Sequence, residues 1–281
     1  MFDALSGFIV EWMWLVIVVL FAAFAALEFA SRGFPGQRDG GTRRVVVNFG
    51  LALLSAATEL AVPVGTLAVA AFADEQGIGL FNVVAAPGLL VLAATFVART
   101  FVAYWLHRAM HAVPWLWRIH RVHHSDRDFD VTLGLRQHPL AGPVSLPFHA
   151  ATGLLLGLPA WAVVIVDTAL LAAAYWEHTD APLSPRWSRI FSGTVMTPNA
   201  HRVHHSAWQP QTDRNFGPAL LVWDRLFGTF ADPAKSGVER IGLGDEHDQW
   251  ADSLWQQLVL PFRLVPADRV AGTQELAPER P

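Results

Sequence analysis

The histidines of this 281-residue chain are unevenly distributed. Eight of the twelve fall into three short clusters, which are His107-x3-His111, His120-x2-His123-His124 and His201-x2-His204-His205. Positions i, i+3 and i+4 share one face of a helix, so each cluster is expected to point its imidazoles at one place. Imidazole is a good ligand for zinc, copper, iron and nickel. Because zinc sites use three or four protein ligands, eight imidazoles predict two metal ions.

Other features of the sequence exclude several classes of metal site. The chain has no cysteine, which excludes thiolate-bound zinc, cysteine-bound iron–sulfur clusters and disulfide bonds. It also lacks the Glu-x-x-His motif of carboxylate-bridged di-iron bundles and the His-Glu-x-x-His motif of zinc proteases. A single His-x3-His pair is more often structural than metal-binding, but three clusters in one chain favour a metal site. The predicted centre is therefore rich in nitrogen ligands and poor in carboxylates.

The composition is typical of a membrane protein. Hydrophobic residues make up 53% of the chain, charged residues only 16%, and the mean hydropathy is +0.33. Apolar runs at 8–30, 45–73 and 82–106 are each long enough to cross about 30 Å of hydrocarbon as a helix. A further apolar stretch, 143–178, is interrupted by Gly157-Leu158-Pro159 and predicts a helical hairpin that either spans or re-enters the membrane. The expected fold is an all-α integral membrane protein with about three transmembrane helices and this hairpin, capped by a cytoplasmic, histidine-rich helical catalytic domain.

Three regions follow from this pattern: N-terminal transmembrane helices at 1–96, a catalytic domain with its membrane hairpin at 97–232, and a C-terminal interfacial segment at 233–281. The loop 31–44 carries four arginines, which predicts that this loop and the histidines are cytoplasmic and that the amino terminus is outside. In the C-terminal segment, helical spacing of apolar residues fits either an interfacial helix or a helix packed on the core of the domain. These residues are Trp250, Leu254, Trp255, Leu258, Val259 and Phe262.

Two further motifs accompany the histidine clusters. The first is Arg136-Gln-His138-Pro139-Leu140, and the second is Asn215-Phe-Gly217 followed by Trp223-Asp224-Arg225-Leu226-Phe227-Gly228-Thr229. With the clusters, they resemble the fatty acid hydroxylase and sterol desaturase superfamily of membrane di-iron oxygenases, whose members carry HxxxH, HxxHH and a final HxxHH. The resemblance covers about residues 97–230. One departure is Ala141, where many members have a glutamate after His-Pro-Leu, and this puts any role for that glutamate in doubt.

The resemblance implies a set of iron ligands. They are His107, His111, His120, His123, His124, His201, His204 and His205, with His178 as a ninth ligand or a residue that hydrogen-bonds to one. His138 is either a further ligand or a residue that positions the ligands, whereas His149 and His247 match no motif. Asn215, Trp223 and Asp224 are expected to hold the site in shape. Acceptors for the second nitrogen of each imidazole are expected among Asp126, Asp128, Asp180 and Asp213.

The resemblance also implies a reaction. Two iron ions, which zinc can replace in recombinant protein, would activate O2 and hydroxylate an unactivated C–H bond of a sterol, carotenoid, fatty acyl chain or related lipid. Electrons would come from a separate reductase, ferredoxin or cytochrome, since no such domain is fused to the chain. A desaturase on the same scaffold is the main alternative, and a non-enzymatic zinc-binding or transport protein is a third. The net charge of −4, without a basic run, gives no indication of a nucleic-acid partner. The expected location is the inner membrane of a bacterium, which the strong bias towards arginine over lysine weakly favours.

Overall fold

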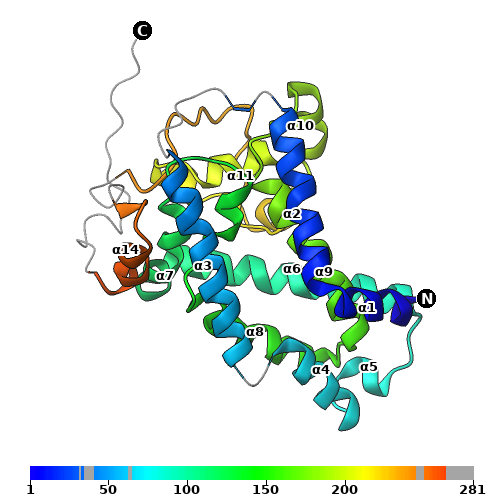
Figure 1. Cartoon of the computed structure of the whole chain (residues 1–281). Coiled ribbons are helices and arrows are strands. Elements are labelled where there is room, and N and C mark those ends of the chain that lie inside the picture. Colours follow the sequence, from blue (N-terminus) through cyan, green and yellow to red (C-terminus); the bar gives the residue numbers. More distant parts are fainter. Residues whose placement is uncertain (32, 35–40, 63–64, 245–249, 264–281) are drawn as a thin grey trace.

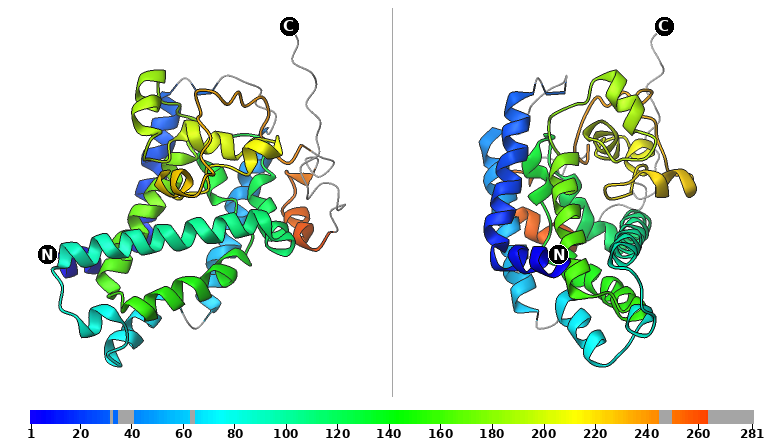
Figure 2. Two further views of the ribbon diagram at one scale, coloured as in Figure 1. Left: turned by 180° about the vertical axis from the view of Figure 1, so that it is seen from behind. Right: turned by 90° about the vertical axis from the view of Figure 1, so that its right-hand side faces the viewer.

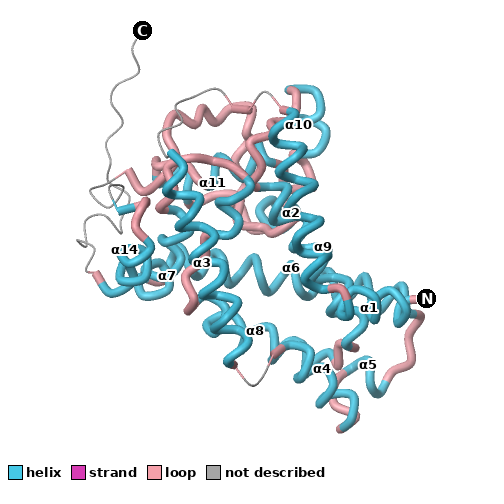
Figure 3. The backbone as a smooth tube through the Cα atoms, viewed as in Figure 1, coloured by secondary structure: helices cyan, strands magenta, loops and turns pink. Residues whose placement is uncertain are grey.

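The structure, a computed structural model of the whole chain, describes residues 1–31, 33–34, 41–62, 65–244 and 250–263 (Figure 1). Helices and loops account for this part of the chain, and its only β pairing is two isolated bridges, Val195 with Leu220 and Ser206 with Ile241 (Figure 3). The expectation of an all-helical fold is confirmed for these residues. His247 and two of the four arginines of the loop 31–44, Arg32 and Arg38, lie outside the described residues.

Four helical stretches of the described chain are long and apolar enough to cross a membrane. Three of them are Met13–Ala30, Gly88–Ala112 and Ala160–Glu177, and the fourth lies within Gly41–Val83, a range that includes residues outside the described part. The axes of α2 (Met13–Ala30), α3 (Gly41–Ala61) and α9 (Ala160–Glu177) have a similar orientation, although the chain runs in opposite directions along α2 and α3, and α6 (Gly88–Ala112) crosses them at a steep angle (Figures 1 and 2). The chain is therefore a multi-pass membrane protein by the length and composition of its helices.

Two of the expected spans are divided in the structure. The first is broken at Trp12, so a short helix α1 (Phe2–Glu11) precedes α2. The second was expected to run unbroken over 45–73, but α3 ends at Ala61 and a separate helix α4 (Thr66–Glu75) packs on the hairpin. Proline cannot donate the i to i−4 hydrogen bond, and Pro63 follows α3 in the sequence, which accounts for an end at this point.

Helix α6 extends six residues beyond the expected end of the third span, to Ala112. It therefore carries both His107 and His111 on continuous helix. A short helix α5 (Leu80–Val83) precedes it, and helix α7 (Pro114–His124) follows after a sharp turn. Pro114 occupies the first turn of α7, where a missing N–H costs nothing.

The predicted hairpin is present as helices α8 (Ala141–Leu156) and α9. Gly157 ends α8 in the left-handed conformation (φ 60°) that glycine adopts without strain. At 16 residues, α8 is shorter than a usual membrane span, while α9 has 18 residues and qualifies as one. The two halves of the hairpin are thus unequal.

The rest of the described chain forms short helices. These are η1 (Val131–Leu135), α10 (Pro185–Phe191), α11 (Pro198–His204), α12 (Gln209–Thr212), α13 (Val222–Leu226), α14 (Leu254–Val259) and η3 (Leu260–Phe262). Of these, α10 and α11 lie near the upper end of α2, and α14 lies beside α3 and α7 (Figure 1). In the C-terminal segment, Leu254 and Leu258 pack on a core that includes Leu51 and Val122, whereas Trp255 and Phe262 are exposed. The segment therefore fits both expected roles, because its leucines pack on the core while its exposed aromatic side chains form an outward apolar face.

Candidate metal centre

Nine histidines converge where the ends of α6, α7, α9 and α11 meet. They form two groups, and within each group one ring nitrogen per residue lies within 4.8 Å of the others. The five-histidine group comprises His107, His111, His120, His124 and His204, and the four-histidine group comprises His123, His178, His201 and His205. The structure thus brings together the eight clustered histidines and His178 as two sites that can each hold a metal ion.

Each His-x2-His-His stretch contributes to both groups. In α7, His120 and His124 belong to the five-histidine group and His123 to the other, while in and after α11 His201 and His205 join the four-histidine group and His204 the other. On a helix, position i+4 lies about 40° from position i, and position i+3 lies about 60° to its other side. The expectation that each stretch points all its imidazoles at one place is therefore wrong, because the third histidine turns towards the neighbouring group.

The distances between ring nitrogens fit metal coordination. In the four-histidine group, Nε2 of His178 lies 3.2 Å from Nε2 of His123 and 2.9 Å from Nε2 of His201. In the five-histidine group, Nε2 of His120 lies 3.0 Å from that of His107 and 3.2 Å from that of His124. Two nitrogens bound at about 2.1 Å and at right angles to one metal lie about 3.0 Å apart. The imidazoles are spaced as neighbouring ligands of one ion.

The second nitrogen of His178 shows that its Nε2 is free to bind a metal. Nδ1 of His178 lies 2.6 Å from the carbonyl of Ala174. A carbonyl accepts only, so this Nδ1 carries the proton and Nε2 of His178 presents a lone pair. Nε2 of His123 and Nε2 of His201 both lie within 3.2 Å of that nitrogen, and one lone pair accepts a single well-directed hydrogen bond, whereas a cation can lie between all three nitrogens. The donor set of the four-histidine group therefore fits a bound metal ion.

The five-histidine group takes its acceptors from the segment 213–216. Nδ1 of His107 donates to the carbonyl of Phe216 (2.8 Å), and Nδ1 of His204 donates to the carbonyl of Arg214 (2.8 Å). His111 Nδ1 lies 3.1 Å from the carboxylate of Asp213. Of the four aspartates named as possible acceptors, Asp213 is thus the one hydrogen-bonded to a clustered histidine. The backbone carbonyls were not foreseen, because no residue type marks them in a sequence.

Comparison with known proteins agrees with this geometry. A sequence model of the fatty acid hydroxylase family matches residues 92–229, which contain all nine histidines. This segment of the chain, just under half of its length, is similar to the fatty acid hydroxylase family. No solved structure matches it.

Curated relatives are lipid hydroxylases and monooxygenases. Alkylglycerol monooxygenase of Homo sapiens is 32% identical over 139 residues, which cover 49% of this chain and 30% of the relative. Ornithine lipid hydroxylase of Rhizobium tropici is 31% identical over 59% of this chain and 48% of its own length, and a fatty acid hydroxylase of a Lecanicillium species is 31% identical over 51% and 42%. The matched part therefore spans about a third to a half of these relatives.

The family motif around Asn215 fixes the segment that supports the five-histidine group. Asn215 adopts a left-handed conformation (φ 55°), and its side chain bonds to the backbone of Ala200 and Ala231. Asp224 accepts hydrogen bonds from the backbone N–H groups of Phe216 (2.7 Å) and Gly217 (2.9 Å). A Cβ on Gly217 would lie 2.9 Å from Asp224 Oδ2 and still closer to the backbone, so only glycine fits there. Asn215 and Asp224 thus hold in place the carbonyls that orient His107 and His204.

Replacing Asp224 with asparagine tests this support. The amide would turn an NH2 group towards a backbone donor, which we expect to lower the free energy of unfolding by about 1–3 kcal/mol. Metal affinity, measured by competition with a chelator, is expected to fall by about 10- to 100-fold, as for other residues that orient ligands. Asp232→Asn is the matched control, because Asp232 also accepts a backbone N–H (Ala234, 3.0 Å) but at the surface. Equal metal affinity in both variants would show that Asp224 does not position the site.

Burial keeps the histidines neutral. Desolvation, followed by repulsion among neighbouring imidazolium charges, lowers the pKa of His120, His124 and His205 well below its ordinary value. The pKa of His178 is lowered to about 4, again mainly by desolvation. Rings that are neutral at pH 7 do not have to lose protons before they bind a metal.

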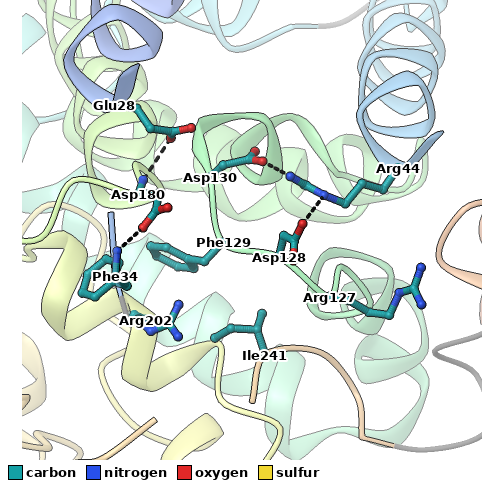
Figure 4. A pocket seen from close by; sticks show the side chains of 10 residues that line it. All are labelled: Glu28, Phe34, Arg44, Arg127, Asp128, Phe129, Asp130, Asp180, Arg202 and Ile241. Atoms are coloured by element: carbon teal, nitrogen blue, oxygen red, sulfur yellow. Dashed lines mark hydrogen bonds and ion pairs between the residues drawn. The ribbon is translucent and has the colours of Figure 1, made fainter. Parts of the chain in front are cut away.

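A buried ionic network holds the loop that follows α7. Arg44 of α3 bonds to Asp126 (3.1 Å), Asp128 (3.1 Å) and Asp130, and Figure 4 shows it reaching the last two. Arg136, which is fully buried, donates to the side chains of Asn48 and Ser125 and to the backbone carbonyls of Val122 and Ala251. Sequence reasoning missed this role of Arg44, although the alternating aspartates at 126, 128 and 130 were a visible signal for a cationic partner.

Phe129 separates this network from the metal centre. Its ring lines a polar cavity of about 60 Å³ beside Arg44 and Arg202, as seen in Figure 4. The same ring lies 5.8 Å from the ring of His205 and 6.3 Å from that of His178. Phe129 therefore forms an apolar wall of the four-histidine group.

Two other expected site residues lie outside both groups. Nε2 of His138 lies 3.2 Å from the carbonyl of Leu258, and Nδ1 accepts the N–H of Leu140 (3.1 Å), so both nitrogens have protein partners. The structure does not bring His138 to either group. Trp223 packs edge-on against Phe101 of α6 (5.1 Å between centroids), where it supports the helix that carries His107.

Proposed function

We propose that this protein is a membrane-bound di-iron oxygenase that hydroxylates an unactivated C–H bond of a lipid. The observation that carries the proposal is the pair of adjacent histidine groups, one of five and one of four, built within a fatty acid hydroxylase domain. The printed names of the relatives favour hydroxylation over the desaturase alternative, since all describe hydroxylases or monooxygenases.

The chain's own residues have distinct tasks in this proposal. The Nε2 atoms hold the ions, and the carbonyls of Ala174, Arg136, Arg214 and Phe216 fix the orientation of four of the rings. Two irons bound there would supply O2 activation, in which one oxygen atom enters the C–H bond and the other leaves as water, with two electrons and two protons consumed. Apolar helices around the site provide a path for a lipid substrate. Because the chain has no cysteine for an iron–sulfur cluster, we propose that the electrons come from a separate reductase, ferredoxin or cytochrome.

Metal and product analysis test the proposal. Protein made in iron-sufficient cells is expected to contain two irons per chain and, with an electron donor, to give an O2-dependent hydroxylated lipid. Zinc found after overexpression would not decide the matter, since zinc binds nitrogen sites readily, so iron is to be reloaded before the assay. A value of one iron per fully loaded chain would rule out the dinuclear centre.

The proposed orientation places the amino terminus outside the cell and the histidines in the cytoplasm. A chain without cysteine is well suited to labelling, because each introduced thiol is the only one present. Asp3→Cys and Lys235→Cys both lie at exposed positions, at the amino terminus and beyond the metal centre. A membrane-impermeant maleimide is expected to label the first in intact cells and the second only after the membrane is opened. The reverse pattern would invert the topology.

A further inference from the structure

A second cavity lies among the apolar helices, apart from the histidine groups. It has a volume of about 410 Å³, within the usual range of small-molecule sites, and residues of α3, α6, α8 and α9 line it. Four ionisable side chains face it, which are Glu59, Arg99, His149 and Asp167. Ionisable groups on apolar membrane helices are costly and usually serve a function.

An ion pair across α6 and α9 forms one wall of the cavity. Nε and Nη2 of Arg99 donate to the two oxygens of Asp167 at 2.8 Å and 2.5 Å. Arg99 lies on α6 and Asp167 on α9, so the pair joins two apolar helices. This pairing cancels both charges and leaves Nη1 of Arg99 without a protein hydrogen bond among the described residues.

Two further polar groups in the cavity lack partners in the described part of the chain. Nδ1 of His149 is buried and has no hydrogen-bond partner. The carboxyl group of Glu59 has no side-chain bond, and helix α8 approaches it closely, since a Cβ on Gly142 would lie 3.0 Å from its Oε1. A buried polar group without a partner is unfavourable, which applies to the ring of His149. A ligand that bonds to His149 would remove this penalty and could also pair with the carboxyl group of Glu59.

The charges that line the cavity indicate whether its ligand is anionic, cationic or uncharged. An anionic head group would meet the carboxyls of Glu59 and Asp167, and a cationic one would meet the guanidinium of Arg99. A hydroxyl group carries no charge and both donates and accepts hydrogen bonds, which suits a site with a carboxyl group, a ring nitrogen and a guanidinium N–H. We propose that this cavity binds the hydroxyl-bearing end of an uncharged lipid.

The position of the cavity relates it to the metal centre. Arg99 precedes His107 by eight residues on the same helix, a separation of about 12 Å along the axis of α6. An alkyl chain of on the order of ten carbons, with bonds of about 1.5 Å, covers that distance. Resting on the proposed function, the inference is that the cavity anchors the polar end of the substrate while a carbon further along the chain faces the histidines.

Binding of tritiated 1-hexadecanol to the full chain in phosphatidylcholine nanodiscs tests the proposal. Binding above that of empty nanodiscs is expected to be saturable, and unlabelled hexadecane and palmitate are expected to compete at least tenfold less well than 1-hexadecanol. Glu59→Leu and His149→Phe are each expected to weaken binding about tenfold, the equivalent of one hydrogen bond. Glu59→Gln keeps a hydrogen-bonding side chain and is expected to restore most of the affinity.

Thr58→Val is the matched control, because Thr58 adjoins Glu59 on α3 but bonds to the carbonyl of Leu54 in its own helix. The thermal midpoint of each variant shows whether it is folded. If palmitate competes as well as 1-hexadecanol, the cavity is an anion site and the proposal is overturned. If hexadecane competes as well as 1-hexadecanol, the hydroxyl group contributes nothing to binding and the proposal is also overturned. Unchanged affinity in both Glu59→Leu and His149→Phe would place the binding elsewhere and also overturn it.

This measurement separates the cavity from the proposed function, because binding requires no turnover. If the protein contains two irons and hydroxylates a lipid but does not bind 1-hexadecanol as expected, the proposed lipid site is wrong and the proposed function stands. If the protein binds 1-hexadecanol as expected but holds only one iron, the proposed lipid site stands and the proposed dinuclear centre is wrong.

Discussion

Changing His123 to alanine is expected to abolish product formation and to reduce the iron content from two ions per chain to one. His123 belongs to the smaller group, so its loss leaves three imidazoles around that ion. Its ring also lies 5.0 Å from that of His178 and 4.6 Å from that of His205, so both neighbours lose a contact. Residues that merely orient ligands already cost 10- to 100-fold, so we expect turnover to fall by more than about 100-fold.

The variant His204→Ala tests the other histidine group. His204 belongs to the five-histidine group, so its loss leaves four imidazoles. We expect this variant to lose turnover as well but to retain more iron than His123→Ala. His138→Ala serves as the control, since His138 lies outside both groups and should keep both irons. Retained turnover in His123→Ala would remove that residue from the ligand set, and iron loss in His138→Ala would add His138 to it.

Changing Arg136 to methionine is expected to cause the largest loss of stability, about 3–5 kcal/mol, because breaking a buried ionic network leaves polar groups unpaired. The Arg136 guanidinium bonds to the carbonyls of Val122 and Ala251 and lies 4.0 Å from the carboxylate of Asp126. Its backbone carbonyl accepts from His123, so we also expect weaker binding of metal to the four-histidine group. The free energy of unfolding and the iron content report the two effects.

Asp252→Asn is the control for that variant. Asp252 pairs with Arg127 at 2.7 Å, but both side chains are a quarter or more exposed, at 30% and 25%. Solvent screens this partly exposed pair, so we expect Asp252→Asn to lose clearly less stability than Arg136→Met. Similar losses in both variants would mean that the burial of Arg136 does not determine its contribution.

The same network predicts a dependence on pH. Burial raises the pKa of the Asp126 carboxyl, but Arg136 and Arg44 outweigh it and hold the pKa below its ordinary value. A carboxyl with a lower pKa in the folded state stabilises the fold above its unfolded pKa of about 3.9, and this contribution is lost as the pH falls below it. The network is thus fully effective at neutral pH.

The sequence was sufficient to predict the all-helical membrane character and the histidines that gather. Both follow from local information, because composition reports membrane burial and the i, i+3, i+4 spacing reports one side of a helix. Motifs around Asn215 and Asp224 likewise marked a segment that supports the site. Their role was predictable because they lie within a short, characteristic stretch.

Tertiary structure alone decided how those histidines are shared. The helical spacing suggested that each His-x2-His-His stretch points its imidazoles at one place, whereas in the structure His123 and His204 each join the other group from their neighbours in the stretch. The carbonyl acceptors, the Arg44 network and the pairing of Arg99 with Asp167 were equally hidden. The two ionic interactions join residues that are tens of positions apart, and the carbonyl acceptors are backbone atoms that every residue has. No local pattern in the sequence can therefore specify these interactions.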